Sequence, residues 1–275
     1  MEPLSRNIED YPDGIVLPVD KPWRWTSADV IRKIKWAAIR HFGKKNLKVG
    51  HAGTLDPLAT GILLVCIGPA TRRAEELQRS PKQYLAGVTF GATTPSYDLE
   101  KEIDCVCPLQ GVTEDSVRAL LPSFIGEQEQ VAPLFSAKSV DGVRVYETAR
   151  KLLKQARAEG RPFDYGAVEG ILQSSLINIY DLQLESFEPD WKQPETAPDT
   201  SRSQRINVAD TSGHDLATAM IRVDCSKGTY IRALARDLGE SLGSGAFLSS
   251  LRRTRNGGFP IEEAVTLEEA LELLA

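Results

Sequence analysis

Residues 48–71, KVGHAGTLDPLATGILLVCIGPAT, contain one acidic side chain, Asp56, within a glycine-rich segment. The apolar run that follows, residues 62–67, ends at Gly68-Pro69 and predicts a buried strand. A lone carboxylate on a loop that is fixed by Pro57 and anchored by a buried strand suits the presentation of a nucleophile or base to a ligand. The structural alternative is a turn aspartate that bonds its own backbone, and an isolated Asp-Pro pair favours this alternative.

The composition describes an ordinary soluble globular protein. Of the 275 residues, 41% are apolar and 26% are charged, and the length suffices for a sizeable core. No apolar run reaches the roughly 18 residues of a membrane span, and the acidic start MEPLSRNIEDYPD argues against a signal peptide. The four cysteines lack Cys-x-x-Cys spacing, which predicts no metal site, no disulfide framework and a reducing cytoplasmic compartment.

Charge is segregated along the chain, although the net charge of −5 argues weakly against nucleic acid. Residues 30–55 contain no acidic side chain, whereas the stretch after Arg255 carries five glutamates and neither lysine nor arginine. Such a distribution could steer a polyanion to one face, and it is equally compatible with a solvated helix face. The basic residues of the first stretch are Arg32, Lys33, Lys35, Arg40, Lys44, Lys45 and Lys48.

Strand-like and helix-like patterns intermix along the chain without an internal repeat, which predicts a mixed α/β or α+β fold. Residues 1–13 read as a loose tail, and the polar residues 189–215 as a surface loop or insertion. The strand-like segments are residues 14–19, 83–90, 170–183 and 216–224. The expected helices span residues 26–43, 114–121, 145–159, 230–242 and 267–274.

The run GHAGTLDPLATGILLVCIGPATR, residues 50–72, resembles the signature of the TruB-type tRNA pseudouridine synthases. Four further blocks follow the order of that family: DKPWRWTS at 20–27, KQY at 82–84, residues 136–150, and CSKGTYIRALARDLGESLGSGAFLSSLRR at 225–253. The resemblance implies an α+β fold, the pseudouridine-synthase core: a mixed, largely antiparallel sheet flanked by helices, with an active-site cleft. It implies a catalytic domain over residues 14–260 and an acidic helix over 261–275, without a recognisable C-terminal RNA-binding module.

The activity implied is the isomerisation of uridine to pseudouridine in the T-arm loop of tRNA. This reaction breaks a nitrogen–carbon glycosidic bond and remakes it to carbon 5 of the same base, so it requires no cofactor and no metal. It does require an ionised carboxylate, a base for the carbon 5 proton and a pocket that retains the detached uracil. The resemblance makes Asp56 the nucleophile toward a flipped-out base, with attack on ribose and attack on the base ring both open.

Four more side chains take catalytic or pocket roles from the resemblance. Arg232 would be the cation that faces Asp56, and Tyr84 would stack on the uracil and act as the candidate base. Tyr230 would be a second pocket tyrosine near the same proton-transfer route, and Leu251 would close the pocket. Each has a structural alternative, as a surface arginine, a core aromatic, a helix residue that packs inward or a core leucine.

The remaining matches concern RNA. His51 would fill the space that the flipped base leaves, Lys21 would support the loop of Asp56, and Lys82 of the Lys-x-Tyr block joins this substrate-binding set. The expected partner is tRNA, bound at its T-arm and elbow. The protein is expected to act as a monomer and not to associate with a membrane. The expected phosphate contacts are Arg32, Lys33, Lys44, Lys45, Lys48, Arg150 and Lys154.

One departure from the family pattern is Arg24, which stands where the family usually has glycine, so we expect a changed or shifted turn there. Two other functions compete with the isomerase. A non-catalytic RNA-binding or RNA-folding protein could use the same scaffold. A hydrolase could instead use Asp56 and Asp98 as a carboxylate pair, as in glycoside hydrolysis.

Overall fold

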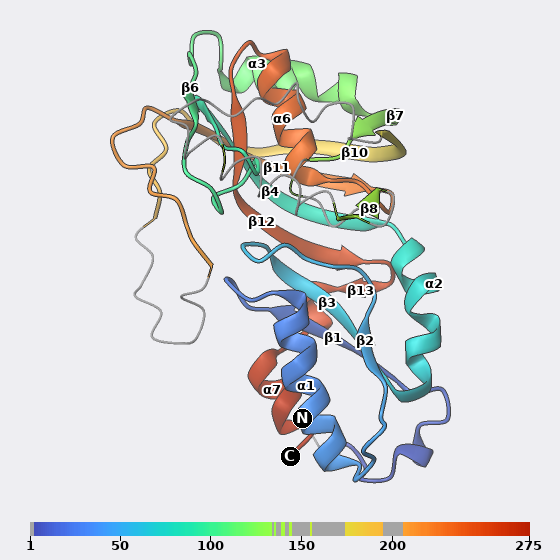
Figure 1. Ribbon diagram of the computed structural model, residues 1–275. Coiled ribbons are helices and arrows are strands. Elements are labelled where there is room, and N and C mark those ends of the chain that lie inside the picture. Colours follow the sequence, from blue (N-terminus) through green and yellow to red (C-terminus); the bar gives the residue numbers. More distant parts are fainter. Residues whose placement is uncertain are drawn as a thin grey trace.

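The computed structural model describes residues 3–133, 135, 139–140, 143–144, 155, 174–194 and 206–275. Through its middle runs a mixed sheet with the strand order β14-β1-β3-β12-β4-β11-β10-β7, to which β2 and β13 are added at β3 and β12 (Figure 1). The pairs β1–β14 and β3–β12 are parallel, and the other pairs of this sheet are antiparallel. The α+β class and the largely antiparallel sheet are therefore as predicted.

The strands of this sheet are β1 (Ile15–Lys21), β2 (Val49–His51), β3 (Thr60–Ile67), β4 (Lys82–Phe90), β7 (Gly126–Val131), β10 (Ser174–Glu188), β11 (Ala217–Cys225), β12 (Ala246–Asn256), β13 (Phe259–Pro260) and β14 (Val265–Thr266). Two short pairs lie outside it, β5 (Ala92–Thr93) with β6 (Cys105–Val106) and β8 (Ser139–Val140) with β9 (Val143–Arg144). The helices are α1 (Ser27–His41), α2 (Ala74–Arg79), α3 (Glu114–Leu120), α6 (Ile231–Ser241) and α7 (Leu267–Glu272). Single 3-10 turns are η1 (Ile8–Asp10), η2 (Gly68–Arg73), η3 (Leu121–Phe124) and η5 (Ile261–Glu263).

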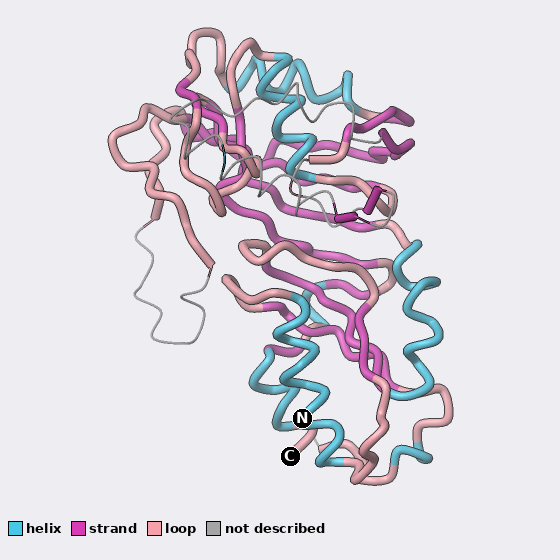
Figure 2. The backbone as a smooth tube through the Cα atoms, in the orientation of Figure 1, coloured by secondary structure: helices cyan, strands magenta, loops and turns pink. Residues whose placement is uncertain are grey.

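Of the four hydrophobic cores in the described residues, the two largest lie toward opposite ends of the sheet. At one end, α3 and α6 lie with β4, β10 and β11, whose apolar side chains form the larger core. At the other end, α1 and α7 lie close to β1 and β3 and to both chain termini (Figure 2). Strand β12 joins the two halves because it pairs with β4 on one side and with β3 on the other.

Helix α1 forms where the sequence predicts it. The Thr26 side chain accepts a hydrogen bond from the Asp29 amide, and the Asp29 carboxylate accepts one from the Thr26 amide, which completes a capping box. Its buried side chains recur at helical spacing, with Val30, Ile34 and Ala38 fully buried. The cap thus fixes the start of α1 next to the loop that carries Asp56.

Strand β3 is apolar from Ile62 to Ile67 because it lies in the interior of the sheet, between β1 and β12. Gly61, at its start, has a φ of 96°, and a Cβ there would lie 2.2 Å from the Arg253 carbonyl oxygen. A side chain at this position would therefore separate β3 from β12. This glycine allows the strand after the Asp56 loop to sit directly beside β12.

Some described residues of two segments expected to be loose are packed against the rest of the protein. Leu4 donates its amide to the Leu273 carbonyl (3.0 Å), and Ile8 is buried in the core of α1 and α7. Within the 189–215 stretch, Trp191 and Ala209 are buried with Phe247. In each case isolated apolar residues in a polar context cover the edge of a core. The expected helix at 145–159 and the block at 136–150 lie largely outside the described residues.

Candidate active site

The loop of residues 52–59, between β2 and β3, presents Asp56 and is held at both flanks of this residue. Ser27 Oγ accepts the Leu55 amide at 2.9 Å and donates to the Leu55 carbonyl at 3.1 Å. Lys21 Nζ donates to the Pro57 carbonyl at 3.1 Å and also to the carbonyls of Pro22 and Trp25. Burial lowers the pKa of Lys21 to about 7, and the negative charge of Asp56 opposes that shift.

Strand β12 holds the first half of the same loop. The guanidinium of Arg253 is buried and donates to the carbonyls of Ile62 (2.7 Å) and Gly53 (3.1 Å). Asn256, also buried, donates to the Ala52 carbonyl at 3.3 Å. Neither anchor was predicted from the sequence, where the one signal for Arg253 is its place in the consecutive pair Arg252-Arg253.

Asp56 receives a bidentate ion pair from α6. Arg232 Nε lies 2.9 Å from Asp56 Oδ2, and Arg232 Nη2 lies 3.2 Å from Asp56 Oδ1. Arg232 also donates to the carbonyls of Ser96 (3.0 Å) and Phe135 (3.1 Å). Its side chain is 6% exposed, whereas that of Asp56 is 37% exposed. The pair is therefore an open carboxylate oriented from behind by a buried cation that also donates to two backbone carbonyls.

Two further carboxylates stand behind this cation. Asp98 Oδ2 lies 3.7 Å from Arg232 Nε, and Asp98 Oδ1 accepts from Ser96 Oγ at 2.6 Å. Burial raises the pKa of Asp98, against the effect of Arg232. Burial and the charges of Asp98 and Asp56 raise the pKa of Glu100 to about 7. Burial alone would lower the pKa of Arg232, but these three carboxylates outweigh it and raise that pKa.

Asp98 is turned toward Arg232 and is 7% exposed, so it does not face a substrate together with Asp56. This geometry disfavours the carboxylate pair that a glycoside-type hydrolase would use.

The two tyrosines and Leu251 lie on three different elements. Tyr84, on β4, pairs with Arg253 of β12 and is buried, and burial raises the pKa of its hydroxyl. Leu251, on β12, is partly buried against the same core. Tyr230 precedes α6, and its backbone exchanges hydrogen bonds of 2.8 and 3.1 Å with the Gln130 side chain. Tyr84 therefore lies beside β12, the strand whose Arg253 and Asn256 hold the loop of Asp56.

His51 and Lys82 have polar groups turned into the protein. His51, on β2, is half-buried, and its Nδ1 has no hydrogen-bond partner among the described residues. Burial, with the charge of Arg253, lowers the pKa of His51. Lys82 Nζ donates to the carbonyls of Gln78 and Ser80, and burial lowers its pKa to about 8. The Lys82 ammonium therefore closes the end of α2, two residues before Tyr84.

The Arg24 turn keeps an arginine in the left-handed region, with a φ of 62°. Arg24 Nη2 donates to the Ile206 carbonyl at 2.8 Å, and its guanidinium carbon lies 5.5 Å from the centre of the Trp23 ring. These contacts hold the residue where the family usually has glycine, and they connect the turn to the end of the polar stretch.

The expected phosphate contacts on α1 and in the following loop are exposed. Among them, Arg32 pairs with Asp29 at 2.9 Å and Lys44 with Glu9 at 3.1 Å. Lys33, Lys45 and Lys48 are likewise exposed, whereas Arg150 and Lys154 lie outside the described residues.

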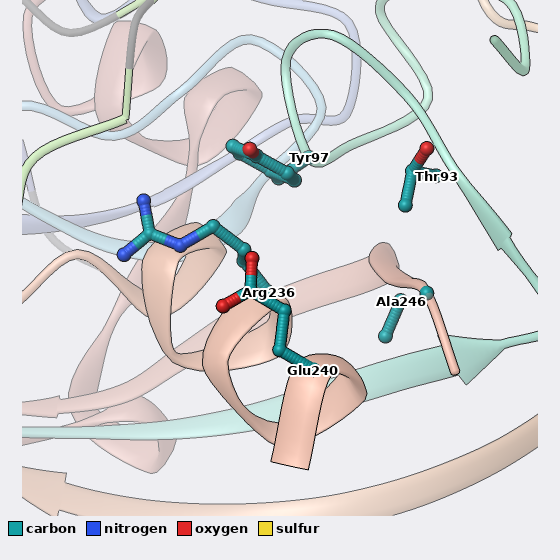
Figure 3. A pocket seen from close by; sticks show the side chains of 6 residues that line it. Thr93, Tyr97, Arg236, Glu240 and Ala246 are labelled. Carbon is teal, nitrogen blue, oxygen red and sulfur yellow. The ribbon is translucent and has the colours of Figure 1, made fainter. Parts of the chain in front are cut away.

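A small open pocket lies beside the site and does not contain Asp56 (Figure 3). Arg236, one turn after Arg232 on α6, points toward the Tyr97 ring, with its guanidinium carbon 5.6 Å from the ring centre. Arg236 also donates to the Val131 carbonyl at 3.2 Å. The residues that line the pocket are Thr93, Tyr97, Arg236, Glu240, Gly245 and Ala246. Tyr97 stands between Ser96 and Asp98 in the sequence, so Arg236 packs against the segment that carries these two residues.

Within the part of the chain that the structure describes, no three His, Cys, Asp or Glu side chains are placed to hold a metal ion. In the same residues, every helix is too short or too polar to cross a membrane.

Two family models match the chain. The model of the TruB family pseudouridylate synthase N-terminal domain matches residues 40–165, and that of the tRNA pseudouridylate synthase B C-terminal domain matches residues 232–275. A tRNA pseudouridine synthase B of Phocaeicola vulgatus is 43% identical over 96% of this chain and 95% of the relative. The chain belongs to the TruB family of pseudouridylate synthases. The Flavobacterium johnsoniae relative of the same name is 38% identical over 96% of this chain and 99% of its own length.

A solved structure shares the TruB-like fold. It is a Cbf5-Nop10-Gar1 complex, in which one chain matches with a TM-score of 0.59 and 25% identity. The match covers 96% of this chain and 56% of that chain. The match to the second family model begins at Arg232, within α6.

Proposed function

We propose that this TruB-family chain converts uridine to pseudouridine in the T-arm loop of tRNA, as a monomer in the cytoplasm and without cofactor or metal. The observation that carries the proposal is the ion pair of Asp56 and Arg232. It leaves the exposed carboxylate on a loop anchored by Ser27, Lys21 and Arg253, inside the family's signature segment. An oriented carboxylate with a buried cation behind it is the arrangement that a nucleophile toward a flipped base requires.

In the proposed reaction, the Asp56 carboxylate attacks the flipped nucleotide, and the bond from base nitrogen 1 to the ribose breaks. The detached uracil turns, and carbon 5 bonds to the ribose in its place. The carbon 5 proton leaves to a base, nitrogen 1 ends protonated, and Asp56 is released, so atoms and electrons balance without a co-reactant. Tyr84 is the candidate for that base, with Tyr230 near the same route, and Leu251 closes the apolar side of the pocket.

The remaining predicted residues would serve RNA binding and loop support. Lys21 fits support of the loop, since its ammonium holds the residue after Asp56. Lys82 would act through the strand of Tyr84 because its ammonium is bound to two backbone carbonyls. His51 would occupy the gap left by the flipped base. The exposed cations of α1 and the following loop, with Arg150 and Lys154, would contact phosphates.

The second candidate is a non-catalytic RNA-binding or RNA-folding protein on the same scaffold. The exposed basic residues of α1 fit it equally well. It gives no reason for a buried arginine to orient an open carboxylate, so the geometry at Asp56 favours the enzyme.

The test is incubation of the protein with an unmodified tRNA transcript, followed by mapping of pseudouridine along the RNA. We expect product in the T-arm loop. Product at another position would replace the proposed substrate, and release of free uracil would indicate a hydrolase. Bound tRNA without product would favour the non-catalytic protein.

A further inference from the structure

The outer face of α1 carries a stripe of four side chains, Arg32, Lys33, Trp36 and Arg40. They follow one another at intervals of one, three and four residues, on the side opposite the buried Val30, Ile34 and Ala38. We call this set the α1 stripe. Trp36 is 63% exposed, the highest value among the large aromatic side chains that the structure describes as exposed. A single exposed aromatic side chain is common on protein surfaces, so a role for Trp36 depends on the charged side chains around it.

Cations cover the aromatic rings of this region. The guanidinium carbon of Arg40 lies 4.4 Å from the centre of the Trp36 ring, and Lys33 Nζ lies 5.2 Å from that of Trp25. A guanidinium stacked on an indole keeps its donor edge free while the ring limits its rotamers, so less entropy is lost when it binds an anion. Arg40 on Trp36 is therefore a preorganised donor for a phosphate.

The α1 stripe starts beside the active site and leads away from it. Ser27, the first residue of α1, bonds both backbone groups of Leu55, the neighbour of Asp56. At 1.5 Å per residue, Arg40 lies about 20 Å further along the helix axis. In Figure 1, α1 runs from the middle of the molecule toward the chain termini. An RNA whose loop reaches Asp56 could thus extend its stem along this helix.

The charge of the surface fits a polyanion. Residues 30–55 contain no acidic side chain, and Asp29, on the same face, is paired with Arg32 and with the helix cap. The acidic helix α7 packs against α1, but the described residues show no ion pair between α7 and the α1 stripe. Arg40 and Lys33 therefore keep their charge available to a ligand.

We propose that the α1 stripe is a second RNA contact, which binds the sugar–phosphate backbone of the substrate's stem with Arg40 as a phosphate clamp held by Trp36. The inference rests on the proposed function, since it takes the RNA bound at Asp56 as the occupant. In this proposal the α1 stripe contributes to the affinity for RNA and takes no part in the isomerisation.

The test measures tRNA dissociation constants over a salt series for the full chain and its variants. Arg40→Ala should weaken binding about five- to tenfold at low salt and reduce the salt slope by about one. Trp36→Ala should weaken it about two- to fivefold. Because Trp36 acts through Arg40, the double variant should bind no more weakly than Arg40→Ala, while Trp36→Tyr should restore most of the loss.

Arg118→Ala is the matched control, since Arg118 is an exposed helix arginine paired with Glu114 on α3, and it should leave affinity unchanged. Arg118→Ala should also leave single-turnover pseudouridine formation unchanged, whereas Arg40→Ala and Trp36→Ala should need more enzyme to saturate the RNA. Unchanged affinity in Arg40→Ala, or additive losses in the double variant, would overturn the clamp. If wild type binds tRNA as described but forms no pseudouridine, the proposed function fails and the α1 stripe stands.

Discussion

In the loop of residues 52–59, buried side chains hold backbone carbonyls, whereas on the outer face of α1 the cations face solvent. Lys21, Arg253 and Asn256 donate to the loop from β1 and β12, and their side chains are buried. Arg40 and Lys33 lie on aromatic rings at the surface. The two regions meet at Ser27, which begins α1 and bonds Leu55.

The difference shows that one set of cations positions the Asp56 loop, whereas another set provides affinity for the RNA. A buried cation that binds carbonyls has given up its hydration, so it holds the backbone in one place and is costly to remove. An exposed cation remains hydrated and attracts phosphate over a distance, at an energy that salt reduces. Substitutions in the loop anchors should therefore lower the rate, and substitutions on α1 should lower affinity.

The largest effect is expected from Arg232→Met. It leaves Asp98, Glu100 and Asp56 close together without their cation, so activity should fall by roughly three orders of magnitude or more. The free energy of unfolding should drop by about 3–5 kcal/mol. Single-turnover kinetics and thermal unfolding measure the two effects. Arg232→Lys keeps the charge without the bidentate geometry, and wild-type rates in that variant would contradict the positioning role.

A smaller effect is expected from Arg253→Met. The carbonyls of Gly53 and Ile62 lose their donor, which should lower the free energy of unfolding by about 2–4 kcal/mol. The loosened loop should lower the single-turnover rate about 10- to 100-fold, while tRNA affinity stays within about twofold. A variant whose tRNA affinity collapsed while its rate held would show that the loop serves binding.

Glu100 should make the stability of this region depend on pH. Its folded-state pKa of about 7 lies above the ordinary 4.5, so the folded protein binds more protons than the unfolded chain between these values. Stability should therefore fall as pH rises from about 4.5 to 7. Glu100→Gln should flatten this slope and gain about 1–2 kcal/mol at pH 8. Urea unfolding at pH 5 and pH 8 measures this, and an unchanged slope would remove Glu100 as the cause.

The smallest effect is expected from Lys44→Gln, in the exposed loop after α1. Its ion pair with Glu9 is exposed on both sides, so the free energy of unfolding should change by less than about 0.5 kcal/mol. Affinity for tRNA should fall about twofold at low salt and the rate should hold. Filter binding measures the tRNA affinity. A lower single-turnover rate in this variant would contradict the assignment of the α1 region to affinity alone.

Regular elements could be predicted from the sequence because their patterns are local. The capping residues and apolar spacing of α1, and the apolar run of β3, each lie within one short segment. Packing of residues 3–13 could not be predicted, because Leu4 and Ile8 are isolated apolar residues in a polar stretch. Their partners, such as Leu273, lie at the other end of the chain.

The site was harder to derive from local pattern. Asp56 and Arg232 are 176 residues apart, and family resemblance suggested their pairing where periodicity could not. Arg253 and Asn256 are about as distant from the loop that they hold, and their bonds go to backbone carbonyls, which carry no sequence signal. Arg40 and Trp36 lie on the face that the apolar spacing of α1 leaves exposed, but spacing does not predict that the guanidinium lies over the ring.

The most direct measurement follows pseudouridine formation and tRNA binding together in Asp56→Asn. Asparagine keeps the shape of the side chain but is a far weaker nucleophile. We predict loss of isomerisation with tRNA affinity within about threefold of wild type. Pseudouridine formed by this variant at a rate near that of wild type would contradict the role assigned to Asp56.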